Sequence, residues 1–243
     1  MIGFWMAWGM FCAIPCPVKK WDQAQYPAML LCTPLIGLMI GGLWAAFGYV
    51  SYRFHLGFVG AAFLCALPSI LSGFIHLDGY MDCADAVLSR RELEKRREIL
   101  KDSHVGSFAV ICIGLWLLFG FAAFSGMELK SKWLCLLFLP AVSRSCSITA
   151  VLSFLPMSTS GYAKLPDSVR PHHKLLGVGE TVLFCALAVV FCGRAGLSAS
   201  VASLGSWVTI LSIRKDLQGM SGDISGSAIT VGELCGVVAL ALL

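Results

Sequence analysis

Long apolar runs alternate with short polar segments along almost the whole chain. A helix needs roughly 20 apolar residues to cross a bilayer. Seven segments approach this length, so the pattern predicts an all-α, polytopic integral membrane helical bundle with about seven transmembrane helices, in which residues 1–243 form a single membrane-embedded domain. The predicted spans are Ala28 to Val50, Gly57 to Ile75, Gly106 to Gly126, Lys132 to Leu152, Val178 to Gly196, Leu197 to Ile213 and Ser227 to Leu243.

The apolar start of the chain is rich in Trp and Phe but is too short to span a bilayer. It lacks the basic start and the small-residue cleavage site of a signal peptide, so we expect an interfacial or re-entrant segment. Pro15 and Pro17 end it, because two prolines so close together cannot continue a helix. Pro34, Pro68 and Pro140 lie inside predicted spans, where they are expected to kink the helix.

The composition agrees with a membrane protein. Hydrophobic residues make up 58% of the chain and charged residues only 13%, about half of what a soluble domain carries. Most of the 11 cysteines lie inside apolar runs and form no Cys-x-x-Cys pair, so they are interpreted as small apolar residues. The net charge of +4 comes from basic residues that flank apolar segments, which gives nucleic-acid binding no support.

Lysine and arginine are distributed unevenly between the two sides of this bundle. Counted on alternate sides of the seven spans, thirteen lie on the side of the amino terminus and four on the other, and Arg144 falls within a span. The positive-inside rule then places the amino-terminal side in the cytoplasm. The same parity puts three polar segments there: residues 76–104, 153–177 and 219–226.

The densest polar segment holds seven of the fourteen acidic residues, between His76 and His104. If residues 78–88 are helical, Asp78, Asp82 and Asp85 lie on one face at i, i+4 and i+7. Like charges at this spacing repel, so they need a cation, and hard carboxylate oxygens favour Mg²⁺ over zinc. The alternative is a solvated acidic helix face at the membrane edge.

Other polar positions are weaker candidates by themselves. Gly222 and Gly226 belong to a glycine-rich turn that can approach a phosphate, and the neighbouring Asp223 is either a metal ligand or a helix cap. Arg144 in a span needs a carboxylate, phosphate or backbone partner, unless it snorkels to the interface. Glu233, in the last span, is a functional candidate for the same reason.

These residues carry a resemblance that runs nearly end to end. The pattern His76-x-Asp78-Gly79-x-x-Asp82-x-x-Asp85, followed by Lys101-Asp102-Ser103-x-x-Gly106, resembles the signature of the cobalamin synthase family, the adenosylcobinamide-GDP ribazoletransferases. Ile14 to Pro17, Pro34 to Gly37, Pro140 to Arg144 and Ser221 to Gly226 are similar to further elements of that family. Ala86, Ala109 and Ser227 depart from its pattern, and none of them removes a proposed ligand.

The resemblance implies a multi-pass transferase of the bacterial or archaeal cytoplasmic (inner) membrane, with its active site facing the cytoplasm. It implies that adenosylcobinamide-GDP is joined to α-ribazole, or its 5′-phosphate, with release of GMP in cobalamin biosynthesis. Mg²⁺ is the implied cofactor and the lipid bilayer the implied surroundings, and a homo-oligomer is left open. The implied roles are metal ligation for Asp78, Asp82, Asp85, Asp102 and Asp223, catalysis for Asp82, Asp85, Asp102 and His76 (or His104), and substrate binding for Lys101, Ser103, Arg144, Gly222 and Gly226.

Three other functions compete with this interpretation. A secondary transporter also has intramembrane charges, but no second copy of the acidic pattern is found. A CDP-alcohol phosphotransferase also uses an Asp-rich motif at the membrane edge, but its Asp-Gly-x-x-Ala-Arg core is absent, since Asp82 and Cys83 stand where that core has Ala and Arg. A membrane scaffold would not need ordered, uncompensated carboxylates.

Overall fold

The computed structural model describes residues 1–157, 160 and 169–243. In this part of the chain the fold is all-α, as predicted, and its β-structure is limited to one isolated bridge between Pro156 and Met220. The helices are α1 (Ile2–Phe11), η1 (Gln23–Gln25), α2 (Tyr26–Phe54), α3 (Gly57–Leu71), α4 (Ile75–Leu88), α5 (Leu93–Ile99), α6 (Ser107–Gly126), η2 (Leu129–Ser131), η3 (Trp133–Leu137), α7 (Leu139–Ser153), α8 (Pro171–Cys192), η5 (Gly193–Gly196), α9 (Leu197–Leu217) and α10 (Gly222–Leu242).

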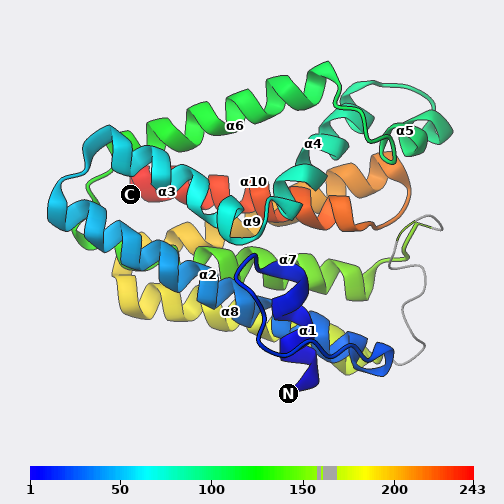
Figure 1. Cartoon of the computed structure of the whole chain (residues 1–243), viewed down its shortest axis with the longest axis horizontal. Helices are drawn as coiled ribbons and strands as arrows, with labels where there is room; N and C mark the ends of the chain where they lie inside the picture. The colour runs from blue at the N-terminus through cyan, green and yellow to red at the C-terminus, as the bar shows by residue number, and fades with distance from the viewer. Residues whose placement is uncertain (158–159, 161–168) are drawn as a thin grey trace.

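Helix α7 is the centre of the bundle, with α2, α8, α9 and α10 packed around it (Figure 1). Every residue from Leu139 to Leu152 is buried, although the helix is rich in serine. Its hydroxyls are satisfied locally, because Ser145 Oγ donates to the Val142 carbonyl and Thr149 Oγ1 donates to the Ser145 carbonyl. A polar helix is therefore stable inside the bundle.

Glycines let α2 approach this central helix closely. A Cβ on Gly37 would come within 2.8 Å of the Ala141 Cα, and a Cβ on Gly41 would collide with the Leu137 carbonyl. The expected close helix contact in the first span is thus confirmed. The kink predicted at Pro140 is wrong, because Pro140 stands at the start of α7, where its missing N–H costs nothing.

The predicted pair of spans around Gly196 is an antiparallel hairpin. The Cys146 sulfur lies 4.0 Å from the Thr181 hydroxyl in α8 and 3.2 Å from the Ser203 hydroxyl in α9. In one straight helix these two residues would be about 33 Å apart. The chain must therefore reverse between them, and it does so at η5, where Gly193 has a φ of 59°.

The second predicted span is wrong in its geometry. Helices α3 and α4 are bent by 92° relative to each other, and Gly73 and Phe74 between them both have positive φ. The acidic helix α4 is therefore one arm of a sharply bent helix pair, whereas we expected it to follow a complete span. The helical conformation predicted for residues 78–88 is confirmed by α4.

Within the described residues, five segments are long and apolar enough to cross a membrane, or six if the bent α3–α4 pair is one span. One of the five is Pro171–Leu217, which contains the whole α8–α9 hairpin. With the hairpin counted as two helices, the segments agree with the prediction of about seven. Helix α1 is a shorter apolar helix that packs on α2, where Gly3 touches the backbone at Ala28 and Met29.

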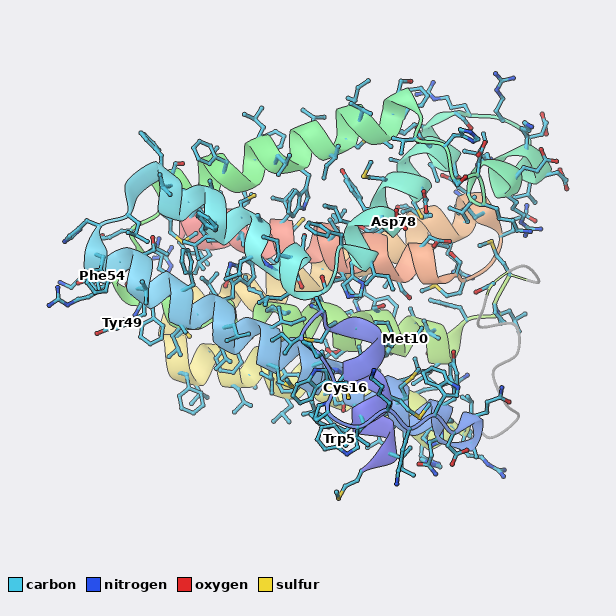
Figure 2. The ribbon with its side chains drawn as sticks, viewed as in Figure 1. Trp5, Met10, Cys16, Tyr49, Phe54 and Asp78 are labelled. Carbon is cyan, nitrogen blue, oxygen red and sulfur yellow. The ribbon has the colours of Figure 1, made fainter. Side chains whose placement is uncertain are left out.

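The two ends of the bundle differ in character. The end of α4, α5, the start of α6 and the start of α10 gather at one end of the molecule, and charged side chains cluster there (Figures 1 and 2). Asp78 lies toward this end, while Tyr49 and Phe54 lie at the opposite end (Figure 2). The polar segments that flank α4 and α10 therefore share one end of the bundle, as the predicted topology requires.

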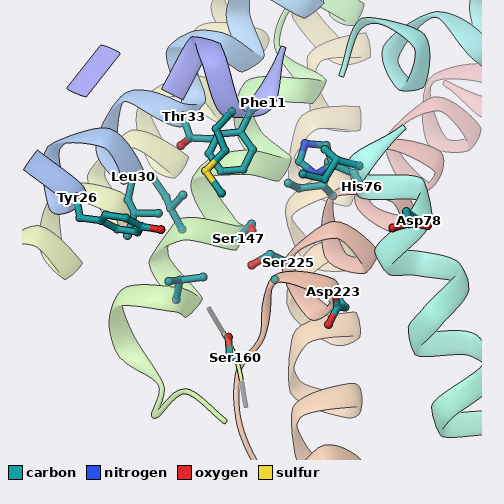
Figure 3. Close-up of a pocket in the computed structure, with 16 residues that line it drawn as sticks. Phe11, Tyr26, Leu30, Thr33, His76, Asp78, Ser147, Ser160, Asp223 and Ser225 are labelled. Atoms are coloured by element: carbon teal, nitrogen blue, oxygen red, sulfur yellow. The ribbon is translucent and has the colours of Figure 1, made fainter. Parts of the chain in front are cut away.

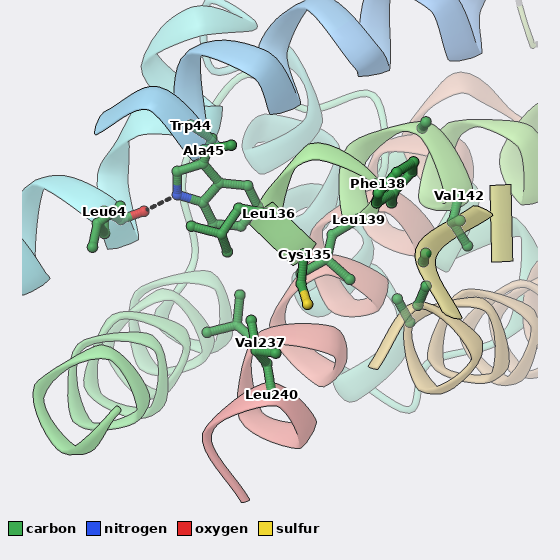
Figure 4. Close-up of a cluster of buried hydrophobic side chains, with 14 of the residues drawn as sticks. Trp44, Ala45, Leu64, Cys135, Leu136, Phe138, Leu139, Val142, Val237 and Leu240 are labelled. Atoms are coloured by element: carbon green, nitrogen blue, oxygen red, sulfur yellow. Dashed lines mark hydrogen bonds between the residues drawn. The ribbon is translucent and has the colours of Figure 1, made fainter. Parts of the chain in front are cut away.

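The interior away from that end is a sealed apolar cluster (Figure 4). Trp44, Leu136 and Leu139 are at most 2% exposed, and Val237 and Leu240 of α10 pack against them. The indole N–H of Trp44 donates to the Leu64 carbonyl over 2.8 Å, so the one polar atom of this ring has a partner. This cluster fixes α10 against α2 and α7 and so sets where the start of α10 lies.

Candidate active site

A cavity of about 210 Å³ lies among α1, α2, α4, α7 and α10 (Figure 3). Its apolar wall contains Phe11, Tyr26 and Leu30, and Asp78 and Asp223 lie at the opposite side of the view. Neither lysine nor arginine is found among the described residues that line it. The full lining is Met10, Phe11, Tyr26, Leu30, Thr33, Ile75, His76, Asp78, Ser147, Ile148, Val151, Ser160, Gly222, Asp223, Ser225 and Ile229.

The two acidic residues meet because α4 and α10 touch without intervening side chains. A Cβ on Gly79 would come within 2.8 Å of the Asp223 Cα, and a Cβ on Gly226 would come within 2.9 Å of the His76 carbonyl oxygen. Hydrogen bonds hold the contact, since Ser227 Oγ donates to the Gly79 carbonyl over 3.0 Å. Gly226, predicted to bind substrate, thus has a packing role in this structure.

The start of α10 is organised around Ser221. Its hydroxyl accepts a hydrogen bond from the Ile224 N–H over 3.3 Å and is 3.3 Å from Asp223 Oδ2. Ser221 is therefore the helix cap, and Asp223 stands in the first turn. Gly222 is exposed and lines the cavity, so the first N–H groups of α10 lie close to the acidic end.

Asp78, Asp82 and Asp223 form an acidic group from two distant parts of the sequence. Asp82 has the carboxylates of Asp78, Asp223 and Asp85 as charged neighbours. No cluster of three or more His, Cys, Asp or Glu is close enough in the described residues to hold a metal ion by itself. The hard oxygens still fit Mg²⁺, because Mg²⁺ is usually held by one or two carboxylates together with water and substrate phosphates.

Asp85 was predicted to bind metal and to act in catalysis, but in the structure its carboxylate accepts hydrogen bonds from backbone N–H groups at the start of α6. Its Oδ2 accepts from the Gly106 N–H over 2.7 Å, and its Oδ1 accepts from the Ala109 N–H over 3.0 Å. Asp85 therefore caps the start of α6, and a side chain at Gly106 would collide with it. The contact between Asp85 and Gly106 explains the sequence spacing between the motif that ends at Asp85 and the motif that ends at Gly106.

Asp102 does not join the acidic group, contrary to the prediction. It is exposed in the segment between α5 and α6, and its Oδ1 lies 2.6 Å from His104 Nδ1. The hydrogen bond from His104 lowers the pKa of Asp102, and the same bond raises the pKa of His104. Lys101 and Ser103 are likewise exposed there, and their roles in substrate binding stay predictions.

Arg144 was a candidate for substrate phosphate, and the structure gives it a protein carboxylate instead. Its Nη1 lies 2.5 Å from Glu233 Oε1 and also donates to the Pro140 carbonyl over 3.1 Å. Ser143 Oγ donates to the same glutamate oxygen over 3.1 Å. Arg144 is 0% exposed and does not line the cavity, so it does not contact a ligand bound there.

His76 lies in the wall of the cavity, a position that the sequence did not indicate. Its ring is 93% buried, stacks on Phe11 with 6.1 Å between ring centroids, and lines the cavity. Its backbone carbonyl accepts a hydrogen bond from Thr230, but neither its Nε2 nor the buried Ser225 hydroxyl has a partner among the described residues. Ser225 lies in the glycine-rich segment noted in the sequence, but no pattern indicated a role for it. The wall contributed by α1, α2 and α7 was not indicated either, because its residues look like ordinary residues of apolar runs.

The chain is similar over nearly its whole length to a family of known proteins. The family model Cobalamin-5-phosphate synthase matches residues 3–241. A protein named adenosylcobinamide-GDP ribazoletransferase from Clostridium perfringens (strain 13 / Type A) is 34% identical over 242 residues, covering 98% of this chain and 96% of that protein.

Two more distant species carry proteins of the same name. The one from Clostridium botulinum (strain Alaska E43 / Type E3) is 30% identical over 99% of this chain and 97% of its own length. The one from Desulfitobacterium hafniense (strain Y51) is 32% identical over 95% of this chain and 92% of its own length. No solved structure matches the chain.

Proposed function

The chain belongs to the Cobalamin-5-phosphate synthase family, and from this membership we propose that it is an adenosylcobinamide-GDP ribazoletransferase. It joins adenosylcobinamide-GDP to α-ribazole or its 5′-phosphate and releases GMP. A ribose hydroxyl oxygen forms a bond to the phosphorus that carries cobinamide, the bond from that phosphorus to the GMP phosphate breaks, and the hydroxyl proton passes to a base. The enzyme works in a bacterial inner membrane, with the acidic end of the bundle facing the cytoplasm.

One observation carries the mechanistic part of this proposal. Asp78 and Asp223, which are distant in sequence, line one cavity whose described lining contains neither lysine nor arginine. A pyrophosphate substrate carries further negative charge, so its approach to these carboxylates requires a cation. When bound, Mg²⁺ neutralises the pyrophosphate and stabilises the charge that develops on its oxygens.

The chain's own residues then have separate tasks. Asp78 and Asp82 would hold the cation, and the N–H groups at the start of α10 orient the phosphate oxygens. Asp223, at the acidic end of the cavity, accepts the proton of the attacking hydroxyl. Arg144 acts at a distance, because its pairing with Glu233 ties α7 to α10 and so positions the start of α10.

The test is an assay with purified protein in lipid nanodiscs. GMP release from GDP-cobinamide and α-ribazole is measured with Mg²⁺, with EDTA, and after Mg²⁺ is restored. We expect release with Mg²⁺ only, and recovery upon restoring it. Uptake of either substrate into proteoliposomes without GMP release would instead identify a transporter, and release that is unaffected by EDTA would refute the metal requirement.

A further inference from the structure

The cavity beside the acidic group has two chemically different parts. At one side Asp78 and Gly222 are exposed, so this part is open to the surroundings. Away from them the wall is mostly made of rings and aliphatic chains, with Phe11 above and Tyr26 and Leu30 to the side (Figure 3). The hydroxyl residues Thr33 and Ser147 also line this part. A ligand that fills the cavity must therefore be polar at one end and apolar at the other.

Two buried polar atoms in this cavity have no partner within the described protein. They are His76 Nε2 and Ser225 Oγ, and both residues are only 7% exposed. A buried donor or acceptor without a hydrogen bond destabilises a fold, so such atoms commonly serve a ligand. Five other buried side-chain atoms also lack a partner among the described residues, Ser198 Oγ and Arg144 Nε among them, but none of their residues lines this cavity. Other buried polar groups of the core are paired, as the Trp44 indole and the Ser206 hydroxyl both donate to backbone carbonyls.

The proposed reaction offers two aromatic groups for this space. Guanine, on the donor, carries a carbonyl, an amide-like N–H and an amino group along its edge, and each needs a partner when buried. The apolar wall of Phe11, Leu30 and Ile148 offers none of these. The base of α-ribazole is a methylated benzimidazole, which is flat, largely apolar and has a single ring nitrogen free to accept a hydrogen bond.

We propose that this cavity binds the apolar bicyclic base of the acceptor nucleoside, with its ring nitrogen toward His76 or Ser225. This inference rests on the proposed function. The base stacks among the side chains of Phe11, Tyr26 and Leu30, and the ribose extends toward Asp78 and Asp223, where the phosphoryl transfer takes place. The residues of α1, α2 and α7 then determine which base is bound, and the acidic group carries out the phosphoryl transfer.

A substitution that fills the cavity tests this assignment. Val151 of α7 lines the apolar part and is 5% exposed, so Val151→Phe places a ring where the base would lie. We expect at least a tenfold rise in KM for α-ribazole, with KM for GDP-cobinamide within twofold of wild type. The matched control is Val110→Phe on α6, whose side chain is exposed and outside the cavity.

Two further measurements keep the test decisive if Val151→Phe folds poorly. Ser225→Ala removes one unpartnered hydroxyl without adding volume, and we expect it to weaken α-ribazole binding several-fold in equilibrium dialysis without donor. Val151→Phe should weaken the binding of a smaller acceptor, the ribonucleoside of unmethylated benzimidazole, less than it weakens the binding of α-ribazole. This change in base preference is not expected from a general loss of structure.

The outcomes separate the two proposals. If wild-type protein releases GMP but Val151→Phe and Ser225→Ala leave acceptor binding unchanged, the base site is refuted and the function stands. If KM for GDP-cobinamide rises in place of KM for α-ribazole, the cavity holds the donor's guanine and this inference is overturned. If wild-type protein releases no GMP from any acceptor, the function itself fails.

Discussion

Two sets of carboxylates inside this bundle are treated differently by the structure. Glu233 is buried in α10 and is matched by Arg144 at 2.5 Å and by the Ser143 hydroxyl. Asp78, Asp82 and Asp223 lie near one another at the contact of α4 and α10, and no described cation acts on Asp82. The charge of Glu233 is compensated within the fold, whereas the acidic group of Asp78, Asp82 and Asp223 is left uncompensated.

The difference separates a structural charge from a functional one. A buried carboxylate with its own arginine stabilises helix packing only as long as both partners remain. Carboxylates that repel each other reduce stability, so a fold retains them at a site where a bound cation changes the balance. In this bundle both kinds occur on α10, ten residues apart in the sequence, at Asp223 and Glu233.

The strongest way to sharpen the comparison is to remove one uncompensated charge. Asp82→Asn should lower GMP release by about 10³-fold or more, because a charge that stabilises the reacting phosphate is lost. Thermal stability should stay equal or rise, since repulsion among Asp78, Asp82 and Asp223 is relieved. Glu94→Gln on the exposed face of α5 is the control and should leave both quantities unchanged. Near-normal GMP release by Asp82→Asn at saturating Mg²⁺ would remove this residue from the site.

For the compensated charge of Glu233, a substitution is expected to lower stability. Arg144→Met leaves Glu233 buried without a partner and should lower the free energy of unfolding by about 3–5 kcal/mol. Unfolding can be followed by the reaction of buried thiols such as Cys135 and Cys146 with a dye during heating. The double variant Arg144→Met, Glu233→Gln should recover much of the loss. A stable Arg144→Met with GMP release abolished would show that Arg144 serves the substrate instead.

A smaller effect is expected when the contact between the helices is widened. Gly79→Ala forces α4 away from the Asp223 backbone, which costs about 1–3 kcal/mol of overpacking and should lower GMP release by about tenfold as the acidic residues separate. Gly114→Ala in α6 is the control, because its Cβ meets nothing within 4 Å, and it should gain up to about 1 kcal/mol. Equal behaviour of the two variants would contradict the close contact.

The smallest effect is expected at the exposed pair Asp102 and His104. The raised pKa of His104 means that the pair's contribution to stability is present below the ordinary value of 6.5 and is lost as the pH rises through the folded-state pKa. NMR titration should place the His104 midpoint above that value, and Asp102→Asn should lower it while GMP release stays within about twofold. A loss of GMP release as large as that of Asp82→Asn would return Asp102 to the site.

The local pattern of the sequence was sufficient to predict the helical bundle and the acidic helix face that forms one side of the site. Apolar runs long enough to span, and the spacing of Asp78, Asp82 and Asp85, depend only on helix geometry and on the exclusion of unpaired backbone groups from lipid. The alternation of basic loops correctly grouped residues 76–104 and 219–226 at one end, because successive spans reverse direction. Residues 158–159 and 161–168 of the third predicted segment, 153–177, lie outside the described residues.

The tertiary structure decided which polar residues belong together. Asp85 and Asp102 share a motif with Asp78, but Asp85 caps α6 and Asp102 faces outward, because the bend after α3 and the path of α5 set their surroundings. Arg144 found Glu233 through helix packing, and the cavity wall formed from residues that look like any span residue. The chain's own order therefore determined the helices and the kind of chemistry, while long-range packing determined which side chains are free to perform it.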